Sequence, residues 1–266
     1  MFNRILVIAQ LTLLEQVRDK IVNLIFLFAG VVVYFGVVLT QLAQGFEERF
    51  FRDTALAMVE LFGLVLLLGS AYRVVRQDVR KGSSVEMFFV RPLRRWEYLA
   101  GRFAGLSTLL LVGMAVMGGV QLGIITFKGF SWHWLFAVSF AELYLKLIIV
   151  LALAFLLATI TTSQASYLAS TLLIYASGHV TQLMKLLIAR QDSTDTVSLI
   201  LLKPLTYLLP DFSFFGTANR WEGIAAGAVS FSIGGLGLTL LYTVIYAGAL
   251  VVFSSYLFSR AEISPT

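Results

Sequence analysis

Cysteine is absent from this chain of 266 residues, and histidine occurs only twice, at His133 and His179. Without cysteine there is no disulfide, no thiolate metal ligand and no cysteine nucleophile. Three histidine ligands for a catalytic zinc are not available, and the H-E-x-x-H motif does not occur. We therefore expect no catalytic residue and no metal site in this chain.

A phosphate loop of the form G-x-x-x-x-G-K-[ST] is also missing, so we expect the chain to bind no nucleotide and to carry no cofactor. Charged residues make up 13% of the sequence, compared with about 25% in soluble domains. The net charge of +5 is explained by the requirements of membrane topology. We therefore expect no nucleic-acid partner.

Apolar residues are abundant instead, at 59% of the chain, and the mean hydropathy is +0.87. A helix that spans a bilayer needs about 20 mostly apolar residues. Backbone polar groups in hydrocarbon must be paired within their own segment, so each such stretch is expected to be a helix. The sequence predicts an all-α membrane protein, a single domain over residues 1–266 with six transmembrane helices. Their approximate bounds are 21–42, 55–75, 103–127, 136–161, 166–188 and 233–258.

Lysine and arginine residues indicate the orientation of these helices, because positively charged loops stay on the cytoplasmic side. Eight of the 20 fall between residues 73 and 102, in the connection between the second and third stretches. Both termini are then expected in the cytoplasm, and the long connection 189–232 outside. Pro204 and Pro210 break the apolar runs of that connection, which predicts short re-entrant or interfacial helices there.

Residues 1–20 precede the first membrane stretch and differ from it. Apolar side chains recur there at helical spacing, at Ile5, Ile8, Leu11 and Leu14. The polar residues that follow include Glu15, Arg18 and Lys20. This pattern predicts an amphipathic helix that lies in the membrane interface. The alternative is an N-terminal extension of the first membrane helix.

The stretch 76–101 is too charged to span the membrane, but it contains the apolar run 85–90 between two basic patches. Gly82 suits a turn, and Glu86 falls in a first helical turn, where the helix dipole favours an acid. Pro92 ends or kinks that helix. We expect a short cytoplasmic helix held near the membrane. By charge alone, simple anchoring to anionic lipid is an equal alternative.

This stretch resembles the cytoplasmic loop of the ABC-2 family of ATP-binding-cassette permeases. Family members typically have there an acidic residue, Gly-Ser or Gly-Thr, an apolar run, Arg-Pro, a basic residue, Glu-Tyr and Gly-Lys or Gly-Arg. The chain supplies these in the same order: Asp78, Gly82-Ser83, Val85–Val90, Arg91-Pro92, Arg95, Glu97-Tyr98 and Gly101-Arg102. Ala9–Lys20 is similar to the interfacial "elbow" helix of the family, and Leu208–Pro210 to its outer re-entrant region.

The resemblance implies a permease subunit of an ABC exporter in the plasma (inner) membrane of a bacterium, in contact with membrane lipids. It also implies a second permease subunit, as a homodimer, and two copies of a cytoplasmic ABC ATPase that holds ATP and Mg. The short cytoplasmic helix would couple that ATPase to the membrane helices. The residues assigned to this coupling are Arg80, Gly82, Glu86, Met87, Phe88, Arg91, Pro92, Arg95 and Glu97. Those assigned to the elbow helix are Glu15, Arg18 and Lys20.

Four ionisable residues fall within predicted membrane helices: Glu60, Glu142, Lys146 and His179. Such residues are costly in lipid, which makes them candidates for a translocation path. Glu142 and Lys146 are four residues apart, and a local ion pair within one helix is the favoured interpretation for them.

Glycines spaced by four residues occur at Gly119 and Gly123, in the third predicted helix. This spacing permits close approach of two membrane helices. We interpret it as a packing feature and not as a binding site.

Two other functional classes stay open. An ion-gradient-driven secondary transporter would use the same four ionisable residues as relay groups, although no inverted repeat is detectable in the sequence. A membrane assembly factor that transports nothing is the other. Dependence of transport on ATP would separate the ABC interpretation from both.

Overall fold

The computed structural model describes residues 2–18, 47–80, 95–131, 133–190, 209–216 and 233–260, with isolated positions between 27 and 38, at 203, 204 and 206, and at 224. The regular elements in this part of the chain are all helical, which confirms the predicted all-α class. They are α1 (Phe2–Gln16), α3 (Glu47–Arg80), α5 (Arg95–Lys128), α6 (Leu135–Ile160), α7 (Gln164–Arg190), the 3₁₀ helix η2 (Phe212–Phe214) and α10 (Ile233–Arg260).

Four of these helices are long and apolar enough to cross a membrane: Glu47–Val75, Trp96–Lys128, Leu135–Ile160 and Gly234–Phe258. They contain the predicted stretches 55–75, 103–127, 136–161 and 233–258 or nearly coincide with them, so the multi-pass membrane character is confirmed. The predicted stretch 166–188 is helical as part of α7 but is not among the four. The predicted stretch 21–42 lies largely outside the described residues, so the total of six stays a prediction.

The helices α3 and α5 are longer than their apolar stretches predict. Each has 34 residues, which corresponds to about 51 Å of helix, whereas the hydrocarbon core is about 30 Å thick. The charged segment 76–101 was predicted to be a loop, but residues 76–80 continue α3 and residues 95–101 begin α5. Helical hydrogen bonding therefore continues past the end of the apolar run, and residues 81–94 lie outside the described part.

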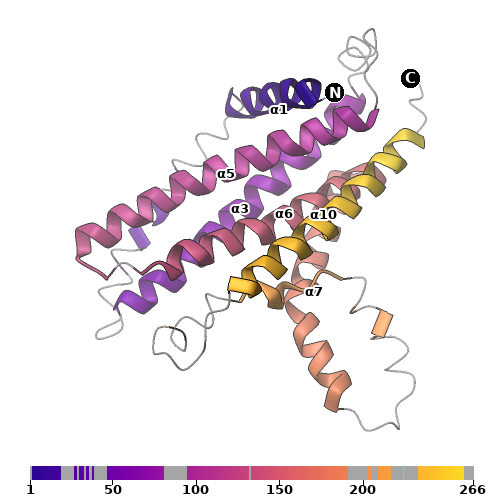
Figure 1. Ribbon diagram of the computed structural model, residues 1–266. Coiled ribbons are helices and arrows are strands. Elements are labelled where there is room, and N and C mark those ends of the chain that lie inside the picture. Colours follow the sequence, from indigo (N-terminus) through magenta and orange to yellow (C-terminus); the bar gives the residue numbers. More distant parts are fainter. Residues whose placement is uncertain are drawn as a thin grey trace.

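Helix α6 lies at the centre of the bundle, between α3, α5, α7 and α10 (Figure 1). Its residues 149–152 are completely buried in succession, so this helix is covered on every side. Close packing against α3 depends on Gly63, because an added Cβ there would lie 2.6 Å from Leu147 Cδ1. The remaining helices pack around α6, and α1 and the end of α10 lie at the same end of the bundle.

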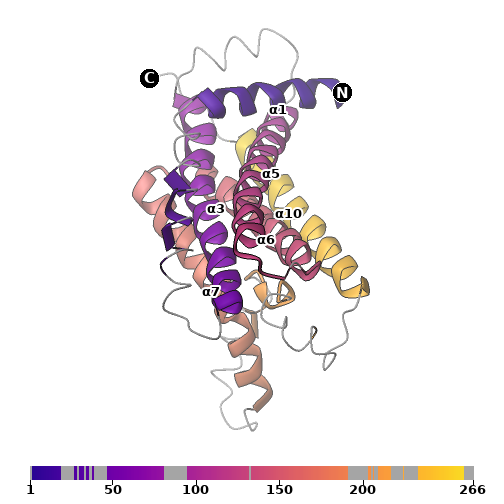
Figure 2. The ribbon, with the colours of Figure 1, turned by 90° about the vertical axis from the view of Figure 1, so that its left-hand side faces the viewer.

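Helix α1 runs across that end of the bundle instead of along it (Figure 2). Its buried residues, Ile8, Thr12 and Gln16, are spaced by four and lie on the side that packs against α5. Leu11 and Leu14, which were predicted to belong to the apolar face, are 37% and 61% exposed. The packed face is therefore partly polar, and the exposed leucines are free to contact lipid.

Two glycines of α5 allow this crossing. An added Cβ at Gly101 would lie 2.7 Å from Ile8 Cβ, and one at Gly105 would lie 2.7 Å from the carbonyl oxygen of Ala9. Backbone therefore approaches backbone where the two helices cross. Gly119, predicted to serve close packing together with Gly123, has nothing within 4 Å of an added Cβ, and neither has Gly123.

The crossing is also fixed by the guanidinium of Arg102, whose side chain is only 5% exposed. Arg102 donates to Glu15 in an ion pair, to Thr12 Oγ1 at 3.3 Å, and to the Tyr98 hydroxyl at 3.0 Å. The first two acceptors belong to α1, so the docking of α1 brings a carboxylate and a hydroxyl to a buried charge of α5. This makes the position of α1 specific.

We expect Gly105→Ala to destabilise the docking of α1. The added methyl group meets a backbone carbonyl that cannot rotate away, and overpacking of this kind costs about 1–3 kcal/mol. Gly119→Ala is the matched control, since the same change on the same helix meets nothing and should raise helix stability by up to about 1 kcal/mol. Thermal unfolding and limited proteolysis of the N-terminal segment in detergent would compare the two. Equal stability of both variants would contradict the crossing.

Candidate functional site

A partly buried polar cluster lies among α3, α6 and α7, formed by Glu60, Lys146, Tyr175 and His179; Lys146 is its most buried member, whereas the His179 side chain is 43% exposed. Lys146 Nζ forms an ion pair with Glu60 Oε1 and lies 2.8 Å from His179 Nε2. The Tyr175 hydroxyl donates to the same oxygen of Glu60. Each of the three helices thus contributes at least one polar group, and the carboxylate of Glu60 lies at the centre of the cluster.

The hydrogen bonds of His179 define its tautomer. A lysine ammonium group only donates, so His179 Nε2 accepts from Lys146. His179 Nδ1 lies 3.1 Å from the carbonyl oxygen of Tyr175, one turn earlier, and therefore carries the proton and donates it. In this arrangement Lys146 contacts both the Glu60 carboxylate and the His179 ring. Protonation of Nε2 would place a second cation against Lys146, with Glu60 Oε1 3.6 Å away.

Three of the four residues predicted for a translocation path therefore lie together: Glu60, Lys146 and His179. The local Glu142–Lys146 pair was the favoured interpretation, but in the structure Lys146 pairs with Glu60 from the neighbouring helix. Glu142 is buried on α6, one turn before Lys146. Spacing along one helix cannot reveal a partner on another helix, which is why sequence alone favoured the local pair.

Phe212 of η2 covers one side of the cluster. Its ring centroid lies 5.2 Å from that of His179 and 5.3 Å from Lys146 Nζ, within the range of a cation–π contact. Gly178 allows this approach, because an added Cβ there would lie 2.6 Å from Phe212 Cε2. Phe212 is itself 5% exposed. The segment that contains it is thus packed onto the cluster and not merely near it.

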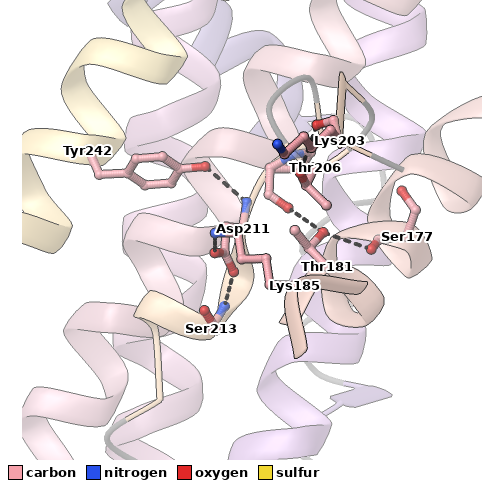
Figure 3. Close-up of polar contacts among 9 residues, drawn as sticks. Ser177, Thr181, Lys185, Lys203, Thr206, Asp211, Ser213 and Tyr242 are labelled. Atoms are coloured by element: carbon pink, nitrogen blue, oxygen red, sulfur yellow. Dashed lines mark hydrogen bonds and ion pairs between the residues drawn. The ribbon is translucent and has the colours of Figure 1, made fainter. Parts of the chain in front are cut away.

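The same segment is tied to α7 and α10 by polar contacts of Asp211 and its neighbours (Figure 3). Asp211 forms an ion pair with Lys185 of α7, and its backbone N–H donates to the Tyr242 hydroxyl of α10 at 2.9 Å. The Ser213 N–H donates to Asp211 Oδ1 at 2.9 Å, and Thr181 Oγ1 donates to the Pro210 carbonyl at 3.3 Å. Asp211 therefore connects η2 to two helices.

Burial raises the pKa of the Asp211 carboxyl, but hydrogen bonds from Lys185 and Ser213 lower it by more, so that the net pKa is below the ordinary value. The charged form is therefore favoured in the folded protein. The connection 189–232 was predicted to contain short helices, and its described part includes η2. Asp211 directly follows the Leu208–Pro210 motif, but its partners Lys185 and Tyr242 are distant in sequence and could not be inferred.

The residues predicted to contact an ATPase are only partly described. Arg80 ends α3 and Arg95 begins α5. Glu97 is 3% exposed, so its side chain is buried within this chain. The others lie outside the described residues: Gly82, Glu86, Met87, Phe88, Arg91 and Pro92.

The elbow residues fall at the end of the α1 segment. Glu15 pairs with Arg102, and Arg18 is exposed. Lys20 lies outside the described residues. Of these three residues, Glu15 is the one whose ion pair holds α1 against α5.

Comparison of the chain with protein-family models gives no match, and comparison with curated protein sequences gives none either. Within the described residues, no group of three or more His, Asp or Glu side chains is placed to hold a metal ion.

Removal of one partner of the Glu60–Lys146 pair should destabilise the bundle strongly. Glu60→Gln or Lys146→Met leaves an uncompensated buried group, at a cost of about 3–5 kcal/mol. The double variant should cost clearly less than the sum of the two, which thermal unfolding of all three in the same detergent would measure. The exposed pair Arg49–Asp53 provides the control, since Asp53→Asn should change stability by only about 0–1 kcal/mol. Additive effects of Glu60→Gln and Lys146→Met would show that the two side chains are not coupled.

Asp211 should make stability depend on acid pH. Because its pKa is lowered on folding, the carboxylate contributes stability above the unfolded value of about 3.9, and that contribution is lost as the pH falls through the folded pKa. Asp211→Asn should therefore reduce the loss of thermal stability between pH 6 and pH 3, whereas the exposed Asp53→Asn should leave it unchanged. An unchanged acid response in Asp211→Asn would contradict the paired state of Asp211.

Proposed function

We propose that this chain is the membrane-spanning permease subunit of an ABC-2-type exporter. In this proposal two permease subunits, as a homodimer in a bacterial inner membrane, bind two copies of a cytoplasmic ABC ATPase, which holds ATP and Mg. The ordered match of residues 76–102 to the family loop supports it. So does the lack of a phosphate loop in a chain with several membrane helices.

The observation that carries the proposal is the docking of α1 on the first turns of α5. Gly101, Arg102 and Gly105 follow the segment 81–94 closely, and all three contact α1. A partner that moves the segment 81–94 must move the start of α5, and α1 must move with it because Arg102 is compensated by Glu15. A permease subunit that does not itself hydrolyse ATP requires such a mechanical connection between its ATPase and its membrane helices.

The cluster of Glu60, Lys146 and His179 would then lie on the translocation path, beneath the segment 209–216. In the structure Phe212 packs over the cluster and Asp211 holds the segment to α7 and α10. Passage of cargo would require this segment to separate from Gly178. We place the segment on the outer side, from the charge asymmetry of the sequence, where it would shape the exit.

An ion-gradient-driven secondary transporter is the second candidate, and the cluster itself favours it. The cluster brings an imidazole, an ammonium group and a carboxylate from three helices into contact, and ionisable groups inside a membrane bundle are typical of ion and proton pathways. Under that proposal Glu60→Gln or His179→Gln would abolish transport and an ATPase would be irrelevant. Transport by purified protein in liposomes, driven by ATP or by a proton gradient, distinguishes the two.

Phe88→Ala and Arg91→Glu should weaken the association with the ATPase, because aromatic and arginine anchors of interfaces contribute about 2 kcal/mol or more, or roughly thirtyfold in affinity. Where association persists, ATP hydrolysis should no longer drive transport. Co-purification with the ATPase and ATP turnover in liposomes would measure both effects. Membrane insertion should be unaffected in both variants.

Simple lipid anchoring of the same segment predicts a different pattern. Phe88→Ala would then leave ATPase binding unchanged, and Arg91→Lys, which keeps the charge, would be harmless in every assay. Normal association and normal coupling in both Phe88→Ala and Arg91→Glu would exclude the coupling role. Tight ATP binding by the purified chain alone would contradict the proposal as a whole.

A further inference from the structure

The polar contacts between α7 and the segment 209–216 have one direction, with donors on α7 and acceptors on the segment (Figure 3). Thr181 Oγ1 donates to the carbonyl oxygen of Pro210 at 3.3 Å, and the Lys185 ammonium group pairs with the Asp211 carboxylate. Thr181 is completely buried, whereas the Lys185 side chain is 49% exposed. The surface of α7 at the segment therefore offers a hydroxyl donor and a cation, and in the structure a carboxylate is bound there.

These contacts lie along one face of α7. Gly178, Thr181 and Lys185 follow each other at spacings of three and four residues, which places them on the same side of the helix. They contact the three consecutive residues 210–212. An added Cβ at Gly178 would lie 2.6 Å from Phe212 Cε2, so the approach is close at this end as well. A continuous strip of α7, and not a single point, is therefore covered.

Phe212 extends the covered surface to a second ammonium group, on α6. Its ring centroid lies 5.3 Å from Lys146 Nζ and 5.2 Å from the ring centroid of His179. If the segment left, the Lys185 ammonium would lose its carboxylate, and the Lys146 ammonium would keep that of Glu60. With two ammonium groups to one carboxylate among these residues, the uncovered surface would favour a negatively charged ligand.

Asp211 and Phe212 indicate which kind of ligand would fit. The Asp211 carboxylate lies on the cation of α7, and next to it the apolar ring of Phe212 packs into the space that Gly178 leaves. Both residues are 5% exposed. Lysine binds carboxylate and phosphate groups alike through charge-assisted hydrogen bonds. A molecule that joins such an acidic group to an apolar group, an acidic amphiphile, has the same chemistry as this pair of residues.

We propose that Asp211 and Phe212 occupy a binding site for an acidic amphiphile. The cations of the site are Lys185 of α7 and Lys146 of α6, and Thr181 adds a hydroxyl donor. The segment and the ligand then compete for the same surface, and the segment keeps the site closed until the ligand displaces it. The inference rests on the proposed function, because it takes this surface for part of the translocation path. Its test measures binding without ATP or an ATPase, so that either conclusion can fail without the other.

The test titrates the purified full chain in detergent with phosphatidic acid and measures lipid binding by native mass spectrometry. Asp211→Asn removes the competing carboxylate but keeps Lys185, so the apparent affinity should rise by about tenfold or more, the effect of one hydrogen bond to a charged group. Lys185→Gln breaks the same ion pair but removes the cation, so it should bring no gain. The double variant should bind at least about tenfold more weakly than Asp211→Asn alone.

Two further variants separate this competition from a change in overall charge or in folding. Asp53→Asn is the matched control, because it removes a carboxylate from an exposed ion pair of α3 and should leave the affinity unchanged. Phe212→Ala removes the apolar part of the internal occupant without a change of charge, and should raise the affinity even if Asp211→Asn folds poorly. Phosphatidylcholine should bind all variants equally, and more weakly than phosphatidic acid.

An affinity for phosphatidic acid that is unchanged in both Asp211→Asn and Phe212→Ala would overturn the proposal. So would a gain in Asp211→Asn that persists in the double variant with Lys185→Gln, or equal binding of phosphatidylcholine and phosphatidic acid. Displacement of the bound lipid by an equal concentration of inorganic phosphate would show that a free anion is recognised, and would contradict the assignment to an amphiphile.

Discussion

The ammonium group of Lys146 sits on the most buried helix of the bundle, where a charge without compensation would cost several kcal/mol. Its partners come from two other helices, Glu60 on α3 and His179 on α7, and Phe212 covers it from the segment 209–216. The positions of α3, α6 and α7 are therefore linked through one charge. Because van der Waals packing between membrane helices is weakly directional, a buried pair of this kind fixes which helices are neighbours.

Arg102 is a second buried cation, at the end of the bundle that α1 crosses, and its charge is compensated in a different way. Its side chain is at least as buried as that of Lys146, but its carboxylate partner Glu15 is 49% exposed and belongs to a helix that lies across the bundle. Gly101 and Gly105 bring the two backbones close enough for this contact. The central pair thus holds helices that run together, and the peripheral pair holds a helix that crosses them.

The sequence predicted the apolar helices well, because hydrocarbon length and backbone pairing leave few alternatives. It did not predict contacts between helices. The spacing of Glu142 and Lys146 pointed to a local pair, and that of Gly119 and Gly123 to close packing, yet Lys146 pairs across helices and the close approach occurs at Gly101 and Gly105. The periodicity of a sequence indicates which residues share one face of a helix. It does not indicate which neighbouring helix that face contacts.

Helix α7 contributes both to the cluster around Glu60 and to the contacts that hold the segment 209–216. Its residues 175, 178 and 179 contact the cluster and Phe212, while Thr181 and Lys185, two and six residues further along, contact Pro210 and Asp211. A rotation or shift of α7 would therefore disturb the Glu60–Lys146 pair and the attachment of Asp211 together. In the proposed transport cycle this coupling matters, because the charged cluster would be opened only when the segment above it is released, and the two events need no separate trigger.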